Sequence, residues 1–459
     1  MIRPAGSETP ELVVSFRQGH AAPVRDTAFG EDLAKMNVKS LCLAAISGLL
    51  LCAVAGPLQA QDTDPDVDLE AGDTAGPDAP EPNPLGLFSH GYVRFGVGST
   101  DNDPMVAFQL NGAASKYRLG NESDLYGEAS IGIRTPMAGG SDFVAEIMFN
   151  GWADSNLLVW GSDVDDGGGV AQAYLGIERL GNSAAAESFL WAGRRYYRRR
   201  DVHITDFYYE NYSNDGLGLE NLDLGSFHLS SALFYYDDDD SDYQAGTVDL
   251  RFHDIALGGK WLGEIGLSYT RTDGTDAPSD NDGYAIRLHA WNLDLPWGEW
   301  QNALMYGRGS GINFNSSGDT GATMDDDRWR FVTQALFTTT EDFQTQATGV
   351  WQRTEIGGET ETWWSVGARP QYNITDNFGL AVEFGYDVVI PEDDDRTSLG
   401  KVTFAPFYSF GKTGFFARPQ LRAFVTYAKW SDPGVITQQA ALDDATDGTT
   451  IGIQYENWW

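Results

Sequence analysis

Cysteine is almost absent from this chain of 459 residues. The two cysteines that occur, Cys42 and Cys52, lie in one short apolar run near the N-terminus, so the rest of the chain has neither a disulfide nor a thiol. Histidine is scarce as well, with six residues, and no serine–histidine arrangement of the kind a hydrolase needs is evident. We therefore expect no enzyme activity, no catalytic residues and no cofactor.

Positive charge is the second shortage, because 30 Lys and Arg face 67 Asp and Glu, which gives a formal net charge of -37. Such a chain repels nucleic acid, whose binding depends on basic side chains at phosphates. No acidic segment has the spaced ligands of a dedicated calcium loop, so we interpret these segments as solvated loops and expect no metal site. The acidic, often Gly-rich segments are Asp163–Gly169, Asp237–Asp242, Asp273–Asp282, Asp325–Asp327, Glu392–Asp395 and Asp443–Asp447.

The chain also lacks an apolar run long enough for a membrane-spanning helix, which needs roughly 20 residues. The longest candidate, Leu41–Ala55, follows Met36 and Lys39 and precedes small residues up to Ala60. This pattern predicts a signal peptide at 36–60, cleaved after Ala60. Residues 1–35 are either the product of a start codon assigned too early or a genuine extended leader. The acidic, Pro-rich residues 61–86 are predicted to be a flexible segment.

From residue 87 to 459 the dominant pattern is alternation of polar with apolar or small residues. Tyr126–Arg134 alternates in this way, and so does Arg418–Tyr427, in which Leu421 and Val425 share one face while Arg422 and Thr426 share the other. Alternation is typical of strands in an outer-membrane barrel, but also of a soluble β-sandwich.

Three features favour the barrel. Tryptophans gather near strand ends, as at Trp297, Trp300 and Trp458-Trp459, where a membrane boundary accommodates amphipathic rings. The chain ends in an alternating strand with a terminal aromatic residue, and acidic segments separate the expected strands. At about 10 residues per strand plus connections, 87–459 accommodates 16 to 18 antiparallel strands around an aqueous lumen.

Several segments are closely similar to the maltoporin family. Phe88–Gly96 (FSHGYVRFG) resembles its first strand, and Ser115–Glu122 (SKYRLGNE) resembles a segment just after it. Trp191–Tyr197 (WAGRRYY), Trp363–Pro370 (WWSVGARP) and Ala423–Trp430 (AFVTYAKW) resemble later family segments, so the resemblance brackets the whole barrel.

The resemblance implies an all-β transmembrane barrel of 18 strands with an inward-folded constriction loop. It also implies a homotrimer, surrounded by outer-membrane lipid and lipopolysaccharide, that passes maltose and maltodextrins passively. In this family a line of aromatic rings contacts the apolar faces of the sugar, and charged side chains beside it exchange hydrogen bonds with the hydroxyls. Another oligosaccharide such as sucrose, or general small solutes, are the alternative cargoes.

Carried over residue by residue, the resemblance assigns the aromatic path to Tyr92, Tyr126, Trp363 and Trp430. The family takes one further ring from a neighbouring subunit's second loop, for which Trp160 is the first candidate and Trp152 the second. The constriction and polar track would contain Arg94, Arg118, Glu128, Arg199, Asp201, Asp206 and Tyr208.

Some positions depart from the family pattern. Ala107 and Ser123 stand where a well-known member has a cysteine pair, so other contacts must hold the first loop. A family arginine falls near Ala171-Gln172, and a family phenylalanine falls near Ile286, where Trp291 is a possible substitute. These departures leave the preferred sugar open.

Overall fold

The computed structural model describes residues 86–459 except 102, 121, 123, 154–165, 182, 238–241, 275–280, 411–413, 439–441 and 443. The predicted leader, signal peptide and acidic segment up to residue 85 lie outside the described residues, as do Ser123 and Trp160. No helix in the described ranges is long and apolar enough to cross a membrane.

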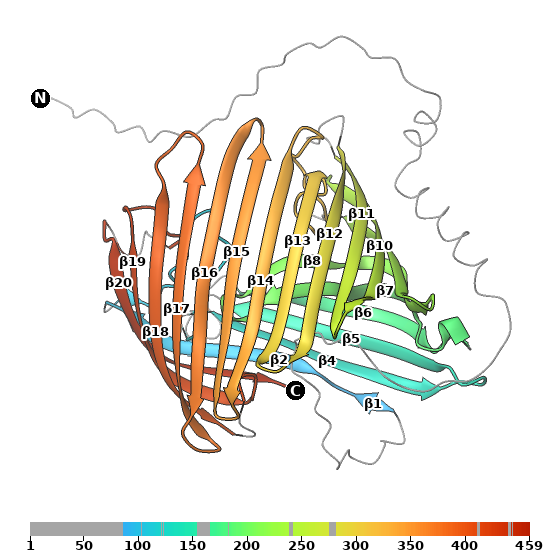
Figure 1. Ribbon diagram of the computed structural model, residues 1–459, viewed down its shortest axis with the longest axis horizontal. Helices are drawn as coiled ribbons and strands as arrows, with labels where there is room; N and C mark the ends of the chain where they lie inside the picture. The colour runs from blue at the N-terminus through green and yellow to red at the C-terminus, as the bar shows by residue number, and fades with distance from the viewer. Residues whose placement is uncertain are drawn as a thin grey trace, which may run out of the picture. The chain divides into compact units, whose positions relative to one another are not determined.

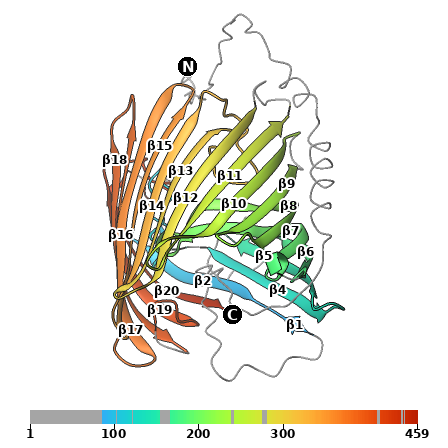
Figure 2. The same cartoon turned by 45° about the vertical axis from the view of Figure 1, so that its right-hand side comes forward.

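In this part of the chain, 18 long antiparallel strands pair in chain order to form a closed barrel (Figure 1). The ring closes where β2 pairs with β20, from Tyr92 opposite Trp458 to Thr100 opposite Thr450. The first strands, in blue, and the last, in red, are therefore neighbours (Figure 2). Closure leaves no first or last strand at a free edge of the sheet, which is what a strand-built membrane protein requires. The predicted 18-stranded barrel is confirmed.

The long strands have these bounds: β2 Gly91–Thr100, β4 Leu125–Pro136, β5 Asp142–Ala153, β6 Asp166–Glu178, β7 Phe189–Val202, β8 Phe207–Asp223, β9 His228–Asp237, β10 Gln244–Gly258, β11 Trp261–Asp273, β12 Asp282–Leu295, β13 Gly298–Gly309, β14 Asp327–Thr340, β15 Phe343–Ile356, β16 Glu359–Asn373, β17 Phe378–Pro391, β18 Thr397–Ser409, β19 Gln420–Trp430 and β20 Asp447–Trp458. The short elements are β1 Leu87–Phe88, β3 Asp103–Pro104 and the 3-10 turns η1 Ser183–Ala185 and η2 His203–Thr205.

The barrel is polar inside and apolar outside. Along β19, Gln420, Arg422 and Thr426 are buried on the interior face, whereas Leu421 and Val425 are exposed on the outer face. Elsewhere Arg251 and Arg287 are fully buried, while Val366 is 55% and Ile451 63% exposed. A soluble protein has the opposite distribution, so the outer surface fits a lipid environment and the β-sandwich alternative is wrong.

The two ends of the barrel differ in their connections. Both Gly91, where β2 begins, and Trp458, where β20 ends, lie at one end, which we call the turn end. The opposite end, called the loop end, carries the four longest connections: 101–124, 154–165, 310–326 and 431–446. All six acidic segments singled out in the sequence lie at the loop end, in connections or in the strand ends that border them.

One hairpin leaves the barrel wall. β7 pairs with β6 only up to Arg194, and β8 pairs with β9 only from Asp215 onwards. Between these points, residues 195–214 pair with each other and form what we call the inner hairpin, with η2 at its tip. Its far side contacts the opposite wall, since Arg330 and Gln334 of β14 donate hydrogen bonds to its backbone carbonyls. The predicted inward-folded constriction loop is confirmed.

The first loop, residues 101–124, also folds inward and contacts the hairpin tip. Its backbone amides at Lys116 and Arg118 donate to the carbonyls of Thr205 and Ile204. Tyr117 reaches the wall, where its hydroxyl meets Ser365 at 2.7 Å and its ring fills a slot above Gly367 and Gly385. Any side chain at either of these facing glycines would collide with the ring. Contacts other than a disulfide therefore hold this loop, as the sequence predicted.

Candidate solute-binding site

The candidate site is built on the interior face where the barrel closes. Cross-strand pairing fixes its layout, because directly opposite residues of an antiparallel pair share a face. One row runs across β5, β4, β2 and β20, and a second row runs beside it. We call these rows the interior band; its residues are Trp152, Tyr126, Arg94 and Glu456 in the first row and Asn150, Glu128, Tyr92 and Trp458 in the second.

Aromatic rings form a continuous path along this band. Trp152 lies directly across from Tyr126, whose ring centroid is 6.1 Å from that of Tyr92. Tyr92 in turn stacks on Trp458 at 6.4 Å. Tyr92, Tyr126 and Trp458 are half-buried and Trp152 is 44% exposed, so each ring retains accessible surface. The result is a set of apolar faces at the spacing of aromatic contacts.

Charged side chains accompany the rings. Arg94 lies 5.9 Å from the Tyr126 ring centroid and Arg118 lies 5.8 Å from that of Tyr92. Glu128 accepts hydrogen bonds from the hydroxyls of Tyr126 and Tyr196. Tyr92 and Tyr126 therefore each have a charged neighbour, and Glu128 is in hydrogen-bond contact with Tyr126.

The inner hairpin faces this band with further aromatic and charged groups. The Arg199 guanidinium lies between two rings, 3.9 Å from the Tyr196 centroid and 4.5 Å from that of Tyr208. It also approaches Glu128 of the wall to 3.8 Å. Tyr208 is 36% exposed, and Asp201 stands directly opposite it in the hairpin. The hairpin and the wall are thus joined around Glu128.

A buried ion network ties the hairpin tip to the band. Arg94 contacts Glu122 at 2.9 Å and Asp206 at 3.5 Å, and Arg118 contacts Glu456 at 2.9 Å. Burial opposes the charge on Asp206, but Arg118, Lys116 and Arg94 outweigh it and hold the pKa of this carboxyl well below its usual range. The tip therefore stays anchored to the wall as an ion pair at neutral pH.

Two residues that the resemblance assigns to the aromatic path do not offer a ring to a solute. Trp363 is on the interior face as expected, but only 1% of it is exposed, and its indole N–H donates to Asp387 at 3.0 Å. Trp430 is 2% exposed, packs on Phe108 of the first loop and donates to the carbonyl of Ala445. The assignment is wrong for both, because inward-folded loops cover this side of the wall.

Three further expectations change. Ile286 is 39% exposed on the outer face of β12, so this position cannot extend an interior path. Trp291 faces inward, but Arg200 of the inner hairpin lies over its ring at 5.8 Å. Trp152, expected as a candidate for a neighbouring subunit's lumen, instead faces the interior of its own barrel beside Tyr126.

Sequence reasoning missed Trp458, Tyr196 and Glu456. Trp458 was interpreted as a membrane-boundary residue, yet it faces inward across from Tyr92. The signal was present in β20, where Trp458 has the parity of Gln454 and Glu456, both buried, whereas Ile451 and Ile453 are exposed.

Comparison with known proteins bears on the class of this barrel. A sequence model of the family described as LamB porin matches residues 88–459. This chain belongs to the LamB porin family. The family match spans the whole barrel, so this LamB porin is a pore-forming protein of the bacterial outer membrane. Its turn end then faces the periplasm and its loop end the outside.

Solved porin structures are similar to this fold at low sequence identity. OccAB2 of Acinetobacter baumannii is 10% identical, with 81% of this chain and 98% of that chain covered and a TM-score of 0.45. OccK1 (OpdK) of Pseudomonas aeruginosa is 13% identical, with 81% and 99% covered and a TM-score of 0.44. OmpT of Vibrio cholerae, in its trimer form, is 10% identical, with 81% and 99% covered and a TM-score of 0.40.

Proposed function

We propose that this LamB porin conducts linear oligosaccharides, with maltose and maltodextrins as the cargo class, by passive diffusion along the interior band. The observation that carries the proposal is the ring path Trp152, Tyr126, Tyr92 and Trp458 with Arg94, Glu128 and Glu456 between and beside the rings. No catalytic residue and no cofactor takes part.

The chemistry of a sugar fits this arrangement. Its pyranose ring has C–H faces that pack on flat aromatic rings, and its hydroxyls exchange hydrogen bonds with ionised partners. Conduction requires that each contact be weak and that several sites follow one another, as in other channels. Four rings in sequence, with charged groups beside Tyr92 and Tyr126, offer several such sites.

The proposal includes a homotrimer whose outer surface contacts lipid and lipopolysaccharide. Exposed apolar residues of the outer face, such as Val366 and Ile451, provide the surface that lipid or neighbouring subunits would cover. Cross-linking followed by mass measurement in mild detergent tests the assembly, and a monomer under these conditions would contradict it.

The proposed cargo is tested in planar bilayers with the purified full chain. We expect maltohexaose to block ion current in a saturable way at millimolar or lower concentration, whereas polyethylene glycol of similar size blocks without saturation. Sucrose and a branched oligosaccharide serve as further solutes. If maltohexaose behaves like polyethylene glycol, a sugar-selective channel is excluded.

A second candidate is a porin for another oligosaccharide such as sucrose, or for small solutes in general. The burial of Trp363 and Trp430 favours it, because it removes two rings from the path that the resemblance implies. Saturable block by sucrose but not maltohexaose identifies the first variant, and the absence of block by any sugar identifies the second.

A further inference from the structure

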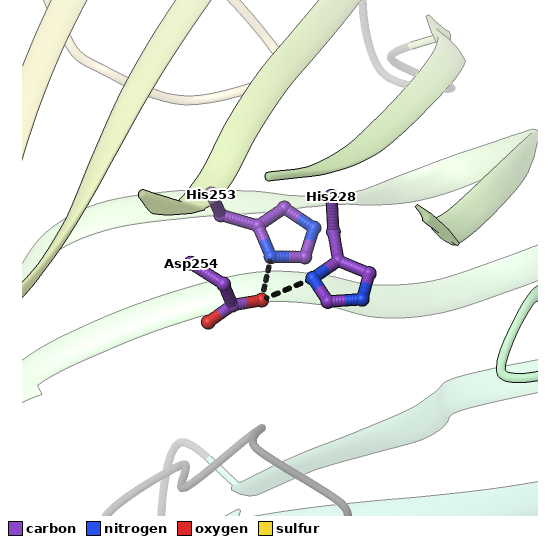
Figure 3. Close-up of side chains that lie close together, drawn as sticks. All are labelled: His228, His253 and Asp254. Carbon is purple, nitrogen blue, oxygen red and sulfur yellow. Dashed lines mark hydrogen bonds and ion pairs between the residues drawn. The ribbon is translucent and has the colours of Figure 1, made fainter. Parts of the chain in front are cut away.

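A cluster of two histidines and an aspartate lies near the turn end, away from the interior band. His228 begins β9, and His253 lies directly opposite it in β10. Their imidazoles stack with centroids 5.6 Å apart, and the Asp254 carboxylate reaches both rings (Figure 3). Asp254 Oδ2 is 2.7 Å from His253 Nδ1 and 3.0 Å from His228 Nδ1.

A break in the strand creates this convergence. Successive side chains of a strand normally point to opposite faces, so His253 and Asp254 should not meet. The register of β10 against β11 shifts between Phe252 and Ile255, and Asp254 has a left-handed backbone with φ 57°. Such a bulge redirects a side chain, and it turns the Asp254 carboxylate toward the two imidazoles.

Hydrogen bonding alone does not account for the cluster. Although Asp254 lies 3.0 Å from it, His228 Nδ1 is buried without a hydrogen-bond partner among the described residues. A buried nitrogen without a partner is costly. A cation that takes a lone pair from each Nδ1 and one from the carboxylate satisfies all three groups together.

The distal nitrogen of His253 has the kind of partner that a metal-bound imidazole needs. A histidine that binds a metal through Nδ1 carries its proton on Nε2 and donates it to an outer partner. Ser230 Oγ lies 2.9 Å from His253 Nε2, whereas the nearest carboxylate oxygen of Glu187 lies 3.9 Å from His228 Nε2, beyond hydrogen-bond distance. Both imidazoles are nevertheless oriented with Nδ1 toward the same point, the Asp254 carboxylate.

We propose that His228, His253 and Asp254 form a binding site for a divalent transition-metal cation of the zinc class. Two imidazole nitrogens and one carboxylate oxygen suit zinc, cobalt or nickel better than calcium or magnesium, which prefer oxygen ligands. Three protein ligands leave one coordination position for water. Exposed fractions of 22% for the His228 side chain and 14% for that of Asp254 leave the site accessible from the turn end.

The test is zinc titration calorimetry on tag-free, chelator-stripped full-length protein in detergent, with millimolar magnesium to occupy the acidic loops. We expect one saturable site per chain. His228→Gln and Asp254→Asn should each weaken zinc binding by more than the roughly 10–100-fold that loss of an outer partner costs, and Ser230→Ala should weaken it within that range.

His90→Gln is the matched control. His90 also meets a carboxylate, that of Glu146 at 3.2 Å, but no second histidine is beside it among the described residues. Its substitution should leave zinc affinity unchanged. The proposal is overturned if the wild-type protein binds no zinc, or if H228Q and D254N bind it as tightly as the wild type. Zinc anomalous scattering at another place but not at this cluster would also overturn it.

Discussion

Two parts of the barrel interior carry inward-facing aromatic residues, but the rings are accessible in only one of them. On β2, β4, β5 and β20 the rings of Tyr92, Tyr126 and Trp458 remain accessible. On β16 and β19, Trp363 and Trp430 have the same inward parity but are buried. The difference lies in what folds over them, because residues of the first and last loops pack against the second pair. Inward orientation is a property of the strand, and accessibility is a property of the loops.

The covered side is also the more tightly packed. Phe108, Leu110 and Ile436 are almost fully buried in one cluster with Trp363 and Trp430. Ser115 and Trp363 both donate to Asp387 of β17, which links the loop and the wall. The interior band, which starts on the neighbouring strand β20, is instead rich in ions and hydroxyls. We infer that the covered region stabilises the fold and that the interior band contacts the solute.

The largest effect is expected when Trp363 is replaced with alanine, which tests whether this buried ring stabilises the fold. Removing a fully buried indole and its hydrogen bond to Asp387 should lower the free energy of unfolding by about 3–5 kcal/mol. Urea unfolding in detergent measures this. Trp364→Ala is the matched control, since Trp364 is 49% exposed on the outer face. A W363A protein of normal stability but weakened sugar block would return Trp363 to the solute path.

Replacing Tyr126 with alanine should affect sugar block rather than the stability of the fold. Loss of one ring contact in the band should weaken maltohexaose block by about 5–30-fold, which corresponds to about 1–2 kcal/mol, with little change in stability. Tyr126→Phe keeps the ring and should retain most of the block. Equal block by wild type and Y126A, measured as the sugar concentration for half-closure, would argue against the band as the path.

Replacing Glu128 with a neutral residue tests the role of its charge where the inner hairpin meets the wall. Glu128→Gln keeps an acceptor for Tyr126 and Tyr196 but removes the charge facing Arg199. Charge-assisted hydrogen bonds are about twice as strong as neutral ones, so a loss of about 1 kcal/mol, or roughly fivefold in block, is expected. Glu128→Asp, which keeps the charge, is the control. An increase in sugar affinity for E128Q would contradict a direct contact.

The smallest effect is expected from acidification at the hairpin tip. His203 packs against Trp458, Phe415 and Phe416, and burial lowers its pKa well below its usual value. Its neutral form is thus favoured in the packed tip, and the packing loses stability as pH falls below about 6.5, where an exposed histidine gains a proton. At pH 6.0 the loss should be under about 1 kcal/mol.

Thermal unfolding midpoints at pH 7.5 and 6.0 measure this effect. His203→Phe keeps a ring but cannot be protonated, so its midpoint should shift less between the two pH values than that of the wild type. A shift of equal size in both proteins would show that His203 does not contribute.

Much of the fold could be predicted from the sequence. The alternation in 126–134 and 418–427 predicted β4 and β19, and the closing strand was recognised from its pattern. The site could be predicted only in part. Tyr92 and Tyr126 were predicted correctly because they fall in segments where the inward-facing positions follow directly from the strand. Trp458 was missed since its terminal position suggested a boundary role, although its parity with Glu456 indicated the interior.

The sequence by itself determined the class of protein, the inward parity of each strand and the charges beside the rings. These properties depend on the two-residue repeat of a strand, which is local. Only the tertiary structure decided which inward rings stay accessible, because the distant loop 101–124 and the loop 431–446, which directly follows β19, fold together over β16 and β19. It also decided that His228, His253 and Asp254 converge, since a bulge and a cross-strand pair bring them together.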